Sequence, residues 1–293
     1  MRIRVVILAV MLSLTFMSTN GTAWAQIELR SGHFQTSDGV ELHYLEAGSG
    51  PTIVFVPGWT APAEIWEPQL NHFAASHRVV ALDPRSQGRS EKPTDGHYLS
   101  RRGQDIGELI EHLDAEPVVV VGWSLAVLEV LTYAQELGSD ALRAAVLVDM
   151  FIGRDLNPGD PHPLAAPWLS PFQMDRKAFT SAFVRSMYRS EQSDEYLEGI
   201  AQAMLSTPTN TAVTLVANVH PLGSGDWRPA LDSLDRPVLY VSAAGNAGQA
   251  EMVRKRRVDA SVEVFADAGH ALFVDEPERF NRVLEEFLAA LPE

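Results

Sequence analysis

The chain has 293 residues, of which 46% are hydrophobic and 21% are charged, and its formal net charge is −15 at pH 7. This composition is typical of a globular protein with a sizeable core, and the length fits one large domain or one domain with an inserted lid. The acidic balance disfavours nucleic acid and anionic lipid as partners, and the lack of cysteine excludes disulfides, lipid attachment to cysteine and a thiol nucleophile.

The first 25 residues have the layout of a secretory signal peptide. Arg2 and Arg4 precede an apolar run over residues 5–16, and the segment 23–25, with alanine at both ends, suits cleavage before Gln26. A retained membrane anchor is the alternative, but the apolar run is short for a membrane span. We therefore expect export to the periplasm or the medium without a stable anchor. Cleavage would remove two positive charges and no negative ones, which changes the formal charge from −15 to −17.

The mature chain begins with alternating strand-like and helix-like segments. Residues 32–37 and 40–47 flank Asp38-Gly39, a pair that favours a hairpin turn. Further along, short apolar runs predict buried strands, and apolar residues spaced three or four apart predict helices. The expected strands are 52–56, 78–82, 117–121 and 144–148, and the expected helices are 63–75, a segment with Ile106, Leu109, Ile110 and Leu113 on one face, and 125–137. This alternation predicts a largely parallel sheet covered on both faces.

The strand pattern stops after residue 150 and resumes near residue 235. The intervening segment is rich in proline at first and then shows helical patterning, so a helical lid explains it better than a long structureless loop. We expect a core domain formed by residues 26–150 and 235–293, with a lid at 151–234. The later expected elements are lid helices near 175–190, 193–206 and 209–218, strands at 237–242 and 261–265, and a last helix with Phe280, Val283, Leu284, Phe287 and Leu288 on one stripe.

One serine lies in a tight turn between an apolar strand and an apolar helix. Residues 118–126 read Val-Val-Val-Val-Gly-Trp-Ser-Leu-Ala, and the small residues Gly122 and Ala126 would let the strand and the helix pass close together. This is the local pattern of a nucleophile elbow, with G-x-S-x-A in place of the commoner G-x-S-x-G. Ser124 is therefore the candidate nucleophile.

A serine hydroxyl needs a base and an oxyanion hole. Among nine histidines, His270 follows the last expected strand, and the carboxyl ends of parallel strands gather catalytic groups at one edge of a sheet. The backbone amide of Leu125, directly after the serine, is the first expected oxyanion donor. The turn after strand 52–56 offers the second, at Trp59, although Pro57-Gly58 also suits a turn without a catalytic role.

Four motifs, taken in order, resemble the α/β-hydrolase family over essentially the whole mature chain. Residues 57–59 stand where the family often has His-Gly-x, residues 83–90 resemble its D-x-R-G-x-G-x-S loop, residues 122–126 resemble its elbow, and 268–270 with 276–280 resemble its histidine loop and last helix. The resemblance implies an α/β fold: a mostly parallel, doubly covered eight-stranded sheet with an inserted helical lid. It points to the branch of serine esterases and cofactor-free haloperoxidases.

The acid of the expected triad does not stand at the position that is usual in this family. Its members usually carry the acid just after the strand expected at 237–242, where residues 243–249 hold no carboxylate. Some members place it one strand earlier, and Asp149 stands there, although many relatives use an acid at that position to anchor a loop. The alternatives are Glu251, a lid acid such as Asp226, or a triad weakened by Asn246.

The remaining candidates concern the substrate pocket and the loop after strand 78–82. Lid aromatics could line an acyl pocket, but their helical spacing fits packing onto the sheet equally well. Asp83 and Arg85 could pair in the loop before Gly88, and a structural role is expected for them rather than a catalytic one. No metal-ligand, phosphate-loop or cofactor motif is evident, so no cofactor or metal is expected. The candidate pocket residues are Trp123, Trp168, Phe172 and Phe183.

These features predict an exported serine hydrolase that cleaves a carboxylic ester or a related acyl bond of a small molecule through Ser124, His270 and Asp149. The family resemblance also allows perhydrolase or haloperoxidase-like, lactonase and amidase activities on the same triad. The alternative to an enzyme is a non-catalytic ligand-binding protein of this fold. It is considered because the chain lacks the His-Gly motif and the acid that family members usually carry after the strand expected at 237–242. The oligomeric state stays open.

Overall fold

The computed structural model describes residues 27–153, 169–219 and 226–292, so the expected signal peptide and Trp168 lie outside the described residues. Its strands form one eight-stranded sheet in the order β1-β2-β4-β3-β5-β6-β7-β8. Strand β2 pairs antiparallel with β1 and β4, and the other pairs are parallel, which confirms the predicted fold class. The strands are β1 (Arg30–Gln35), β2 (Glu41–Ala47), β3 (Thr52–Val56), β4 (Arg78–Leu82), β5 (Val118–Trp123), β6 (Leu142–Val148), β7 (Val238–Ala243) and β8 (Ser261–Phe265).

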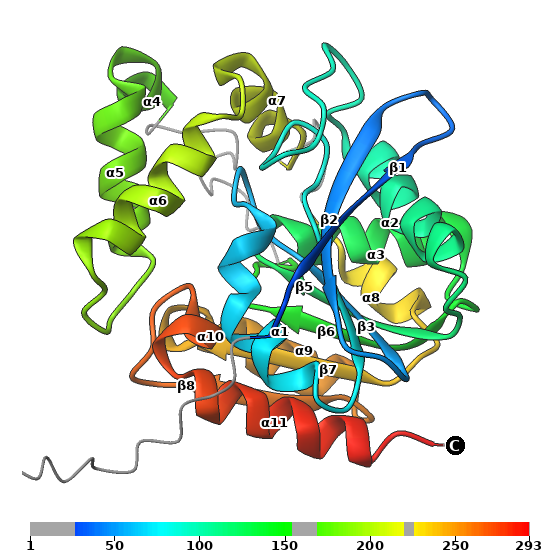
Figure 1. Ribbon diagram of the computed structural model, residues 1–293. Helices are drawn as coiled ribbons and strands as arrows, with labels where there is room; N and C mark the ends of the chain where they lie inside the picture. The colour runs from blue at the N-terminus through cyan, green and yellow to red at the C-terminus, as the bar shows by residue number, and fades with distance from the viewer. Residues whose placement is uncertain (1–26, 154–168, 220–225, 293) are drawn as a thin grey trace, which may run out of the picture.

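The central strands are buried on both faces, as a parallel sheet between two helix layers requires. In β3, Ile53 and Phe55 join one apolar cluster, and Val54 and Val56 join another on the opposite face. Figure 1 shows the helices that cover these faces. The first face is covered by the short helix η1 (Ala63–Trp66), α1 (Glu67–Phe73), α10 (Leu272–Asp275) and α11 (Pro277–Ala289), and the second by α2 (Leu99–Leu113), α3 (Leu125–Leu137), α8 (Arg228–Ser233) and α9 (Ala247–Arg256).

A group of helices between β6 and β7 stands apart from these layers, at the upper left of Figure 1. Its side chains Val184 and Ile200 belong to the same buried cluster as Phe55 of the sheet, so the group packs onto the core. Helix α8 falls within the range expected for the lid, but its Ala230 and Leu231 pack with the helices of the second face. The lid helices are α4 (Leu169–Met174), α5 (Arg176–Ser186), α6 (Asp194–Leu205) and α7 (Thr209–Val219).

The predicted pairing of Asp83 with Arg85 is wrong. The Asp83 carboxylate accepts a hydrogen bond from His43 Nδ1 at 2.7 Å, whereas the Arg85 guanidinium turns toward Asp105 at 2.6 Å and Asp38 at 3.0 Å. Burial alone would raise the pKa of Asp38, but hydrogen bonds from Arg85 and Thr36 lower it to about 2. Asp83 and Arg85 are both fully buried and hold the loop after β4 in place, which agrees with the expected structural role.

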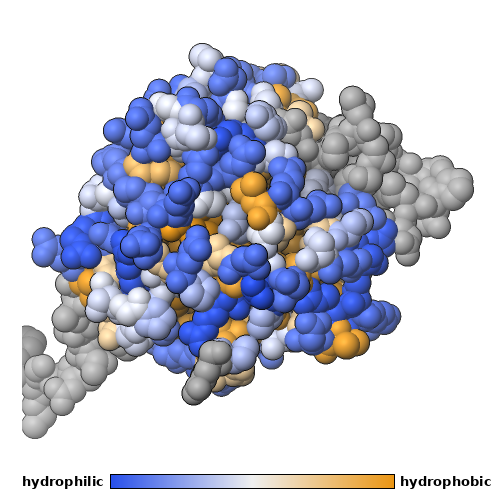
Figure 2. All heavy atoms as spheres, turned by 90° about the vertical axis from the view of Figure 1, so that its right-hand side faces the viewer, coloured by the Kyte–Doolittle hydropathy of each residue, from blue (hydrophilic) through white to orange (hydrophobic). Residues whose placement is uncertain are grey.

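The face of the molecule shown in Figure 2 is mainly polar. On the face shown in Figure 2, hydrophilic side chains predominate and hydrophobic ones form small separate patches, as is usual for monomeric globular domains. None of the helices in the described part of the chain combines the length and the apolar character that a membrane span needs.

Candidate active site

Ser124 occupies the sharp turn between β5 and α3. Its backbone has φ 55° and ψ −125°, a conformation that costs a non-glycine residue about 1–3 kcal/mol. The turn is held because the Ser124 N–H donates to the carbonyl of Val148, at the end of β6, at 2.8 Å. A Cβ atom at Gly122 would lie 2.9 Å from the carbonyl oxygen of Ala126. The close passage of strand and helix therefore requires glycine at 122 and still admits the methyl group at 126.

Three side chains at the carboxyl ends of β5, β6 and β8 form a chain of hydrogen bonds. The Nε2 atom of His270 lies 2.9 Å from Ser124 Oγ, and its Nδ1 atom lies 2.7 Å from Asp149 Oδ2. A carboxylate only accepts, so we assign the proton of the neutral ring to Nδ1. Nε2 is then the acceptor for the serine hydroxyl, which is the arrangement that general-base activation of a serine needs.

Hydrogen bonds also fix the backbone and the side chain of Asp149. Its φ is 49°, its side chain is 3% exposed, and its N–H donates to the carbonyl of Val241 in β7 at 2.7 Å. The carboxylate oxygen that does not face the histidine accepts from the Ala243 N–H at 2.9 Å and from Asn246 Nδ2 at 3.0 Å. One oxygen of Asp149 therefore accepts from the histidine ring, and the other accepts from the two donors of the neighbouring loop.

Asn246 is the residue whose role the sequence reasoning missed. From the sequence, Asn246 is expected only as a sign of a weakened triad, but its amide donates to the carboxylate of Asp149. The signal was present, because an amide donor stands in the stretch where family members usually carry the acid. The other two candidate acids have cationic partners elsewhere. Glu251 pairs with Lys255 at 3.2 Å on the surface, and hydrogen bonds from Arg228 at 2.7 Å lower the pKa of Asp226.

The backbone around His270 is fixed from several sides. The indole N–H of Trp123 donates to the His270 carbonyl at 2.9 Å, and the two rings lie 5.0 Å apart. The N–H of Gly269 donates to Asp275 at 2.7 Å, and the N–H of Ala271 donates to the carbonyl of Met187, just after lid helix α5, at 2.9 Å. Trp123 is 2% exposed, so its observed contacts are with the histidine loop, and its place in a substrate pocket stays a prediction.

The two expected oxyanion donors belong to segments that meet at the serine. Leu125 is the first residue of α3, where backbone N–H groups have no acceptor within the helix and the helix dipole favours negative charge. Trp59 follows Gly58, at which an added Cβ would lie 2.7 Å from Ser124 Cβ. The loop after β3 can approach the nucleophile this closely only because residue 58 has no side chain.

Aromatic residues of the lid surround the side chain of Trp59. The ring centroids of Phe172 and Phe183 lie 5.5 and 5.6 Å from that of Trp59, and the Trp59 indole N–H donates to the carbonyl of Ala212 in α7 at 2.8 Å. Two of the predicted pocket residues thus contact the expected oxyanion loop. Their role in binding an acyl group stays a prediction, because packing between lid and core accounts for the same contacts.

Replacing Asn246 with alanine is expected to lower kcat about tenfold. The change removes one of the two donors to the outer oxygen of Asp149, and a hydrogen bond to a charged group contributes about 1.5–3 kcal/mol, part of which the Ala243 N–H retains. Steady-state kinetics on a p-nitrophenyl ester would measure the effect. The exposed Glu251→Gln variant in α9, the helix that Asn246 precedes, serves as the control, and equal activity of Asn246→Ala and wild type would contradict this role.

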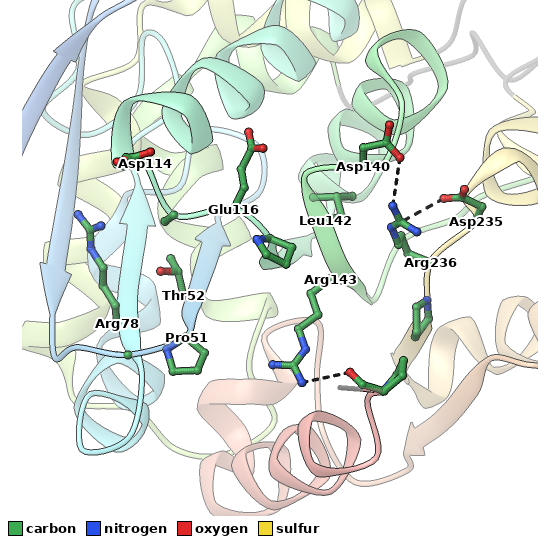
Figure 3. Close-up of a pocket in the computed structure, with 15 residues that line it drawn as sticks. Pro51, Thr52, Arg78, Asp114, Glu116, Asp140, Leu142, Arg143, Asp235 and Arg236 are labelled. Atoms are coloured by element: carbon green, nitrogen blue, oxygen red, sulfur yellow. Dashed lines mark hydrogen bonds and ion pairs between the residues drawn. The ribbon is translucent and has the colours of Figure 1, made fainter.

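A hollow of about 860 Å³ lies at the opposite end of the sheet, where β3, β5, β6 and β7 begin (Figure 3). Among its charged side chains, Arg236 pairs with Asp140 at 3.1 Å and with Asp235 at 3.9 Å. None of the Ser-His-Asp residues lines it. Among the described residues, no three His, Asp or Glu side chains are grouped so that they could hold a metal ion.

Comparison with known proteins agrees with this fold. Residues 53–283 match the alpha/beta hydrolase family. The chain belongs to this family. A curated protein similar to this chain is a non-heme chloroperoxidase of Kitasatospora aureofaciens, 27% identical over 272 residues that cover 86% of this chain and 98% of the relative. Solved structures with a similar fold include an esterase from Exiguobacterium antarcticum, with a TM-score of 0.80, 20% identity and coverage of 88% of this chain and 99% of that one. A putative aryl esterase from Burkholderia cenocepacia has a TM-score of 0.76 and 26% identity, covering 89% and 98% of the two chains.

Proposed function

We propose that this alpha/beta hydrolase is an exported serine hydrolase that cleaves carboxylic esters or related acyl bonds of small molecules. The observation that supports the proposal most strongly is the continuous chain from Ser124 Oγ through His270 to Asp149, with contacts of 2.9 and 2.7 Å. Esterases among the structural neighbours make an ester the first substrate class to test.

In the proposed reaction, His270 Nε2 takes the hydroxyl proton as Ser124 Oγ attacks the acyl carbon. The carbonyl oxygen becomes an oxyanion, which the N–H groups of Trp59 and Leu125 stabilise. His270 then gives its proton to the leaving alcohol, and an acyl-serine forms. Asp149 keeps the imidazole in the required tautomer and stabilises its cationic form. In the second half, water attacks the acyl carbon while His270 takes one of its protons. His270 then returns this proton to Ser124 Oγ as the acyl–oxygen bond breaks, which releases the carboxylic acid and the free serine.

Perhydrolysis is a second candidate, favoured by the similarity to a chloroperoxidase. Hydrogen peroxide would take the place of water, attack the acyl-serine and release a peracid together with the free serine. The ratio of peracid to carboxylic acid, measured by chromatography at increasing peroxide concentration, tests this candidate. A ratio that stays at the level of the uncatalysed reaction would rule it out while leaving ester hydrolysis intact.

Labelling with a fluorophosphonate probe tests the hydrolase proposal against a non-catalytic binding protein. We expect the folded wild-type protein to be labelled in proportion to its concentration, and labelling to vanish in Ser124→Ala. A folded wild-type protein that is never labelled and hydrolyses none of a panel of acyl esters, lactones and amides would contradict the proposal.

Export is part of the proposal and rests on the pattern of residues 1–25. Expression of the full chain in a bacterium, followed by fractionation and sequencing of the N-terminus, would test it. We expect the mature protein outside the cytoplasm, beginning at Gln26. An uncleaved chain in the membrane fraction would support the alternative of a retained anchor.

A further inference from the structure

Gln87, in the loop after β4, contacts the loop that is expected to hold the oxyanion. Its side chain is fully buried, and Nε2 donates to the carbonyl of Gly58 at 2.9 Å and to the carbonyl of Ala61 at 2.8 Å. The two acceptors flank Trp59 and Thr60. One amide group therefore bridges the segment that carries the expected donor N–H.

The orientation of this amide follows from its other partner. Arg102 Nη2 donates to Gln87 Oε1 at 3.0 Å, and a guanidinium has no acceptor atom, so the oxygen must face Arg102. Both hydrogens on Nε2 are thereby directed to the two carbonyls. Arg102 is held in turn by Glu129 of the elbow helix α3, in an ion pair whose side chains are each 1% exposed. A continuous buried network thus connects the elbow helix to the loop after β3.

The contact with Gly58 bears directly on the Trp59 amide. The carbonyl of Gly58 and the N–H of Trp59 belong to one planar trans peptide, so the two groups point in opposite directions. A donor that holds the carbonyl on the Gln87 side keeps the N–H pointing away from Gln87. Glycine admits alternative backbone conformations easily, so this peptide needs an external restraint.

The same loop stores conformational strain. Thr60 is a β-branched residue with φ 58°, in the left-handed region that such residues rarely adopt. Within the loop, the Ala61 N–H also donates to the Gly58 carbonyl at 3.2 Å, a long contact. The shorter hydrogen bonds from Gln87 to both sides of Thr60 are suited to hold this conformation.

We propose that Gln87 is a positioning residue that fixes the Gly58–Trp59 peptide so that the Trp59 N–H is aimed at the oxyanion. The proposal rests on the proposed function, and it adds a residue that acts through the backbone of another. Gln87 touches no reacting atom. Its effect is confined to the stability of the negatively charged tetrahedral state, because only that state needs the aimed N–H.

Two variants test the proposal. Gln87→Glu keeps the size of the side chain and an acceptor for Arg102, but it replaces the two donor hydrogens with an oxygen facing two carbonyls. Gln87→Met removes the donors without adding charge, and it serves if the first variant does not fold. Arg89→Ala is the matched control, since its side chain is exposed, belongs to the same loop and pairs with Glu64.

Loss of one oxyanion donor lowers kcat by about 10²–10³ in a well-studied hydrolase, and a misaimed donor retains part of its effect. We therefore expect kcat per titrated active site to fall about 10- to 100-fold in both Gln87 variants, with KM changed less than about threefold. Affinity for a trifluoromethyl ketone, which forms a tetrahedral oxyanion adduct, should weaken in proportion to kcat/KM. Affinity for the corresponding alcohol, which forms no oxyanion, should not change. Arg89→Ala should match wild type in all of these measurements.

A purely structural role would lower the melting temperature and the titrated fraction of active enzyme but leave kcat per site and ketone affinity unchanged, and that result would overturn the proposal. Unchanged ketone affinity with reduced kcat would also overturn it. These outcomes differ from failure of the proposed function itself, in which wild-type protein shows neither probe labelling nor turnover.

Discussion

Replacing Ser124 with alanine is expected to lower kcat for a short p-nitrophenyl ester by about 10⁶-fold, as removal of the nucleophile does in a well-studied serine hydrolase. The variant keeps the His270–Asp149 pair and both expected oxyanion amides, so a small residual rate above the uncatalysed reaction is expected. Initial-rate kinetics measure the loss, and thermal unfolding checks that the fold is retained.

Ser242→Ala is a matched control for this experiment. Ser242 lies in β7, and its buried hydroxyl makes no hydrogen bond within the described part of the chain. Its replacement should leave turnover near the wild-type level. If Ser124→Ala retained more than about a hundredth of wild-type turnover, the hydroxyl could not be the nucleophile of the measured reaction.

Replacing Asp149 with asparagine is expected to lower kcat by about 10⁴-fold, the loss seen for the corresponding change in a well-studied triad. The hydrogen bonds around this residue give a specific reason. Ala243 and Asn246 both donate to Oδ1, so the asparagine oxygen would occupy that place and its NH₂ group would face His270. The ring would then accept at Nδ1 and carry its proton on Nε2, which could no longer accept the serine proton.

Two comparisons sharpen this experiment. Asp149→Ala removes the orienting group without imposing the wrong tautomer, so it should be no less active than Asp149→Asn. Glu251→Gln changes an exposed carboxylate that pairs with Lys255, and it should match wild type. A crippled Glu251→Gln together with an active Asp149→Asn would show that the acid has been misplaced.

Elements bounded by strong local signals were predicted closely. The expected limits 52–56, 78–82 and 261–265 coincide with β3, β4 and β8, and the expected helix 125–137 coincides with α3. In each case an apolar run ends at a turn or a change of pattern, so the information is local. Strand β5 continues to Trp123, beyond the expected end at 121, because Gly122 and Trp123 pair with β6.

Helix α9 (Ala247–Arg256) was not expected, for a physical reason. It buries only Ala250 and Val253, so it has almost no apolar stripe from which a period could be detected. The lid shows the complementary difficulty. Helices α5, α6 and α7 were expected from their patterning, whereas the short helix α4 was not. Whether Phe172 and Phe183 pack or bind substrate depends on contacts between segments that sequence spacing does not encode.

The residues of the candidate site also differ in how far the sequence predicts their roles. Ser124 and His270 could be found because each lies in a short motif whose geometry is local. Asn246 and Gln87 could not be assigned roles, since each acts through a hydrogen bond to a residue of another loop. Asp149 is intermediate: its position after a strand was informative, but its partners became evident only when β6, β7 and the histidine loop were seen together.

Trapping of the acyl-enzyme is the most direct test of the account, because it identifies the reacting atom. A slowly deacylated p-nitrophenyl carbamate would be mixed with wild-type protein, and the product examined by intact mass spectrometry and peptide mapping. We predict a burst of one nitrophenolate per active site and one acyl group, located on Ser124 and absent from Ser124→Ala. Turnover of p-nitrophenyl esters without any covalent adduct, or an adduct on another residue, would contradict the assignment of Ser124 as the nucleophile.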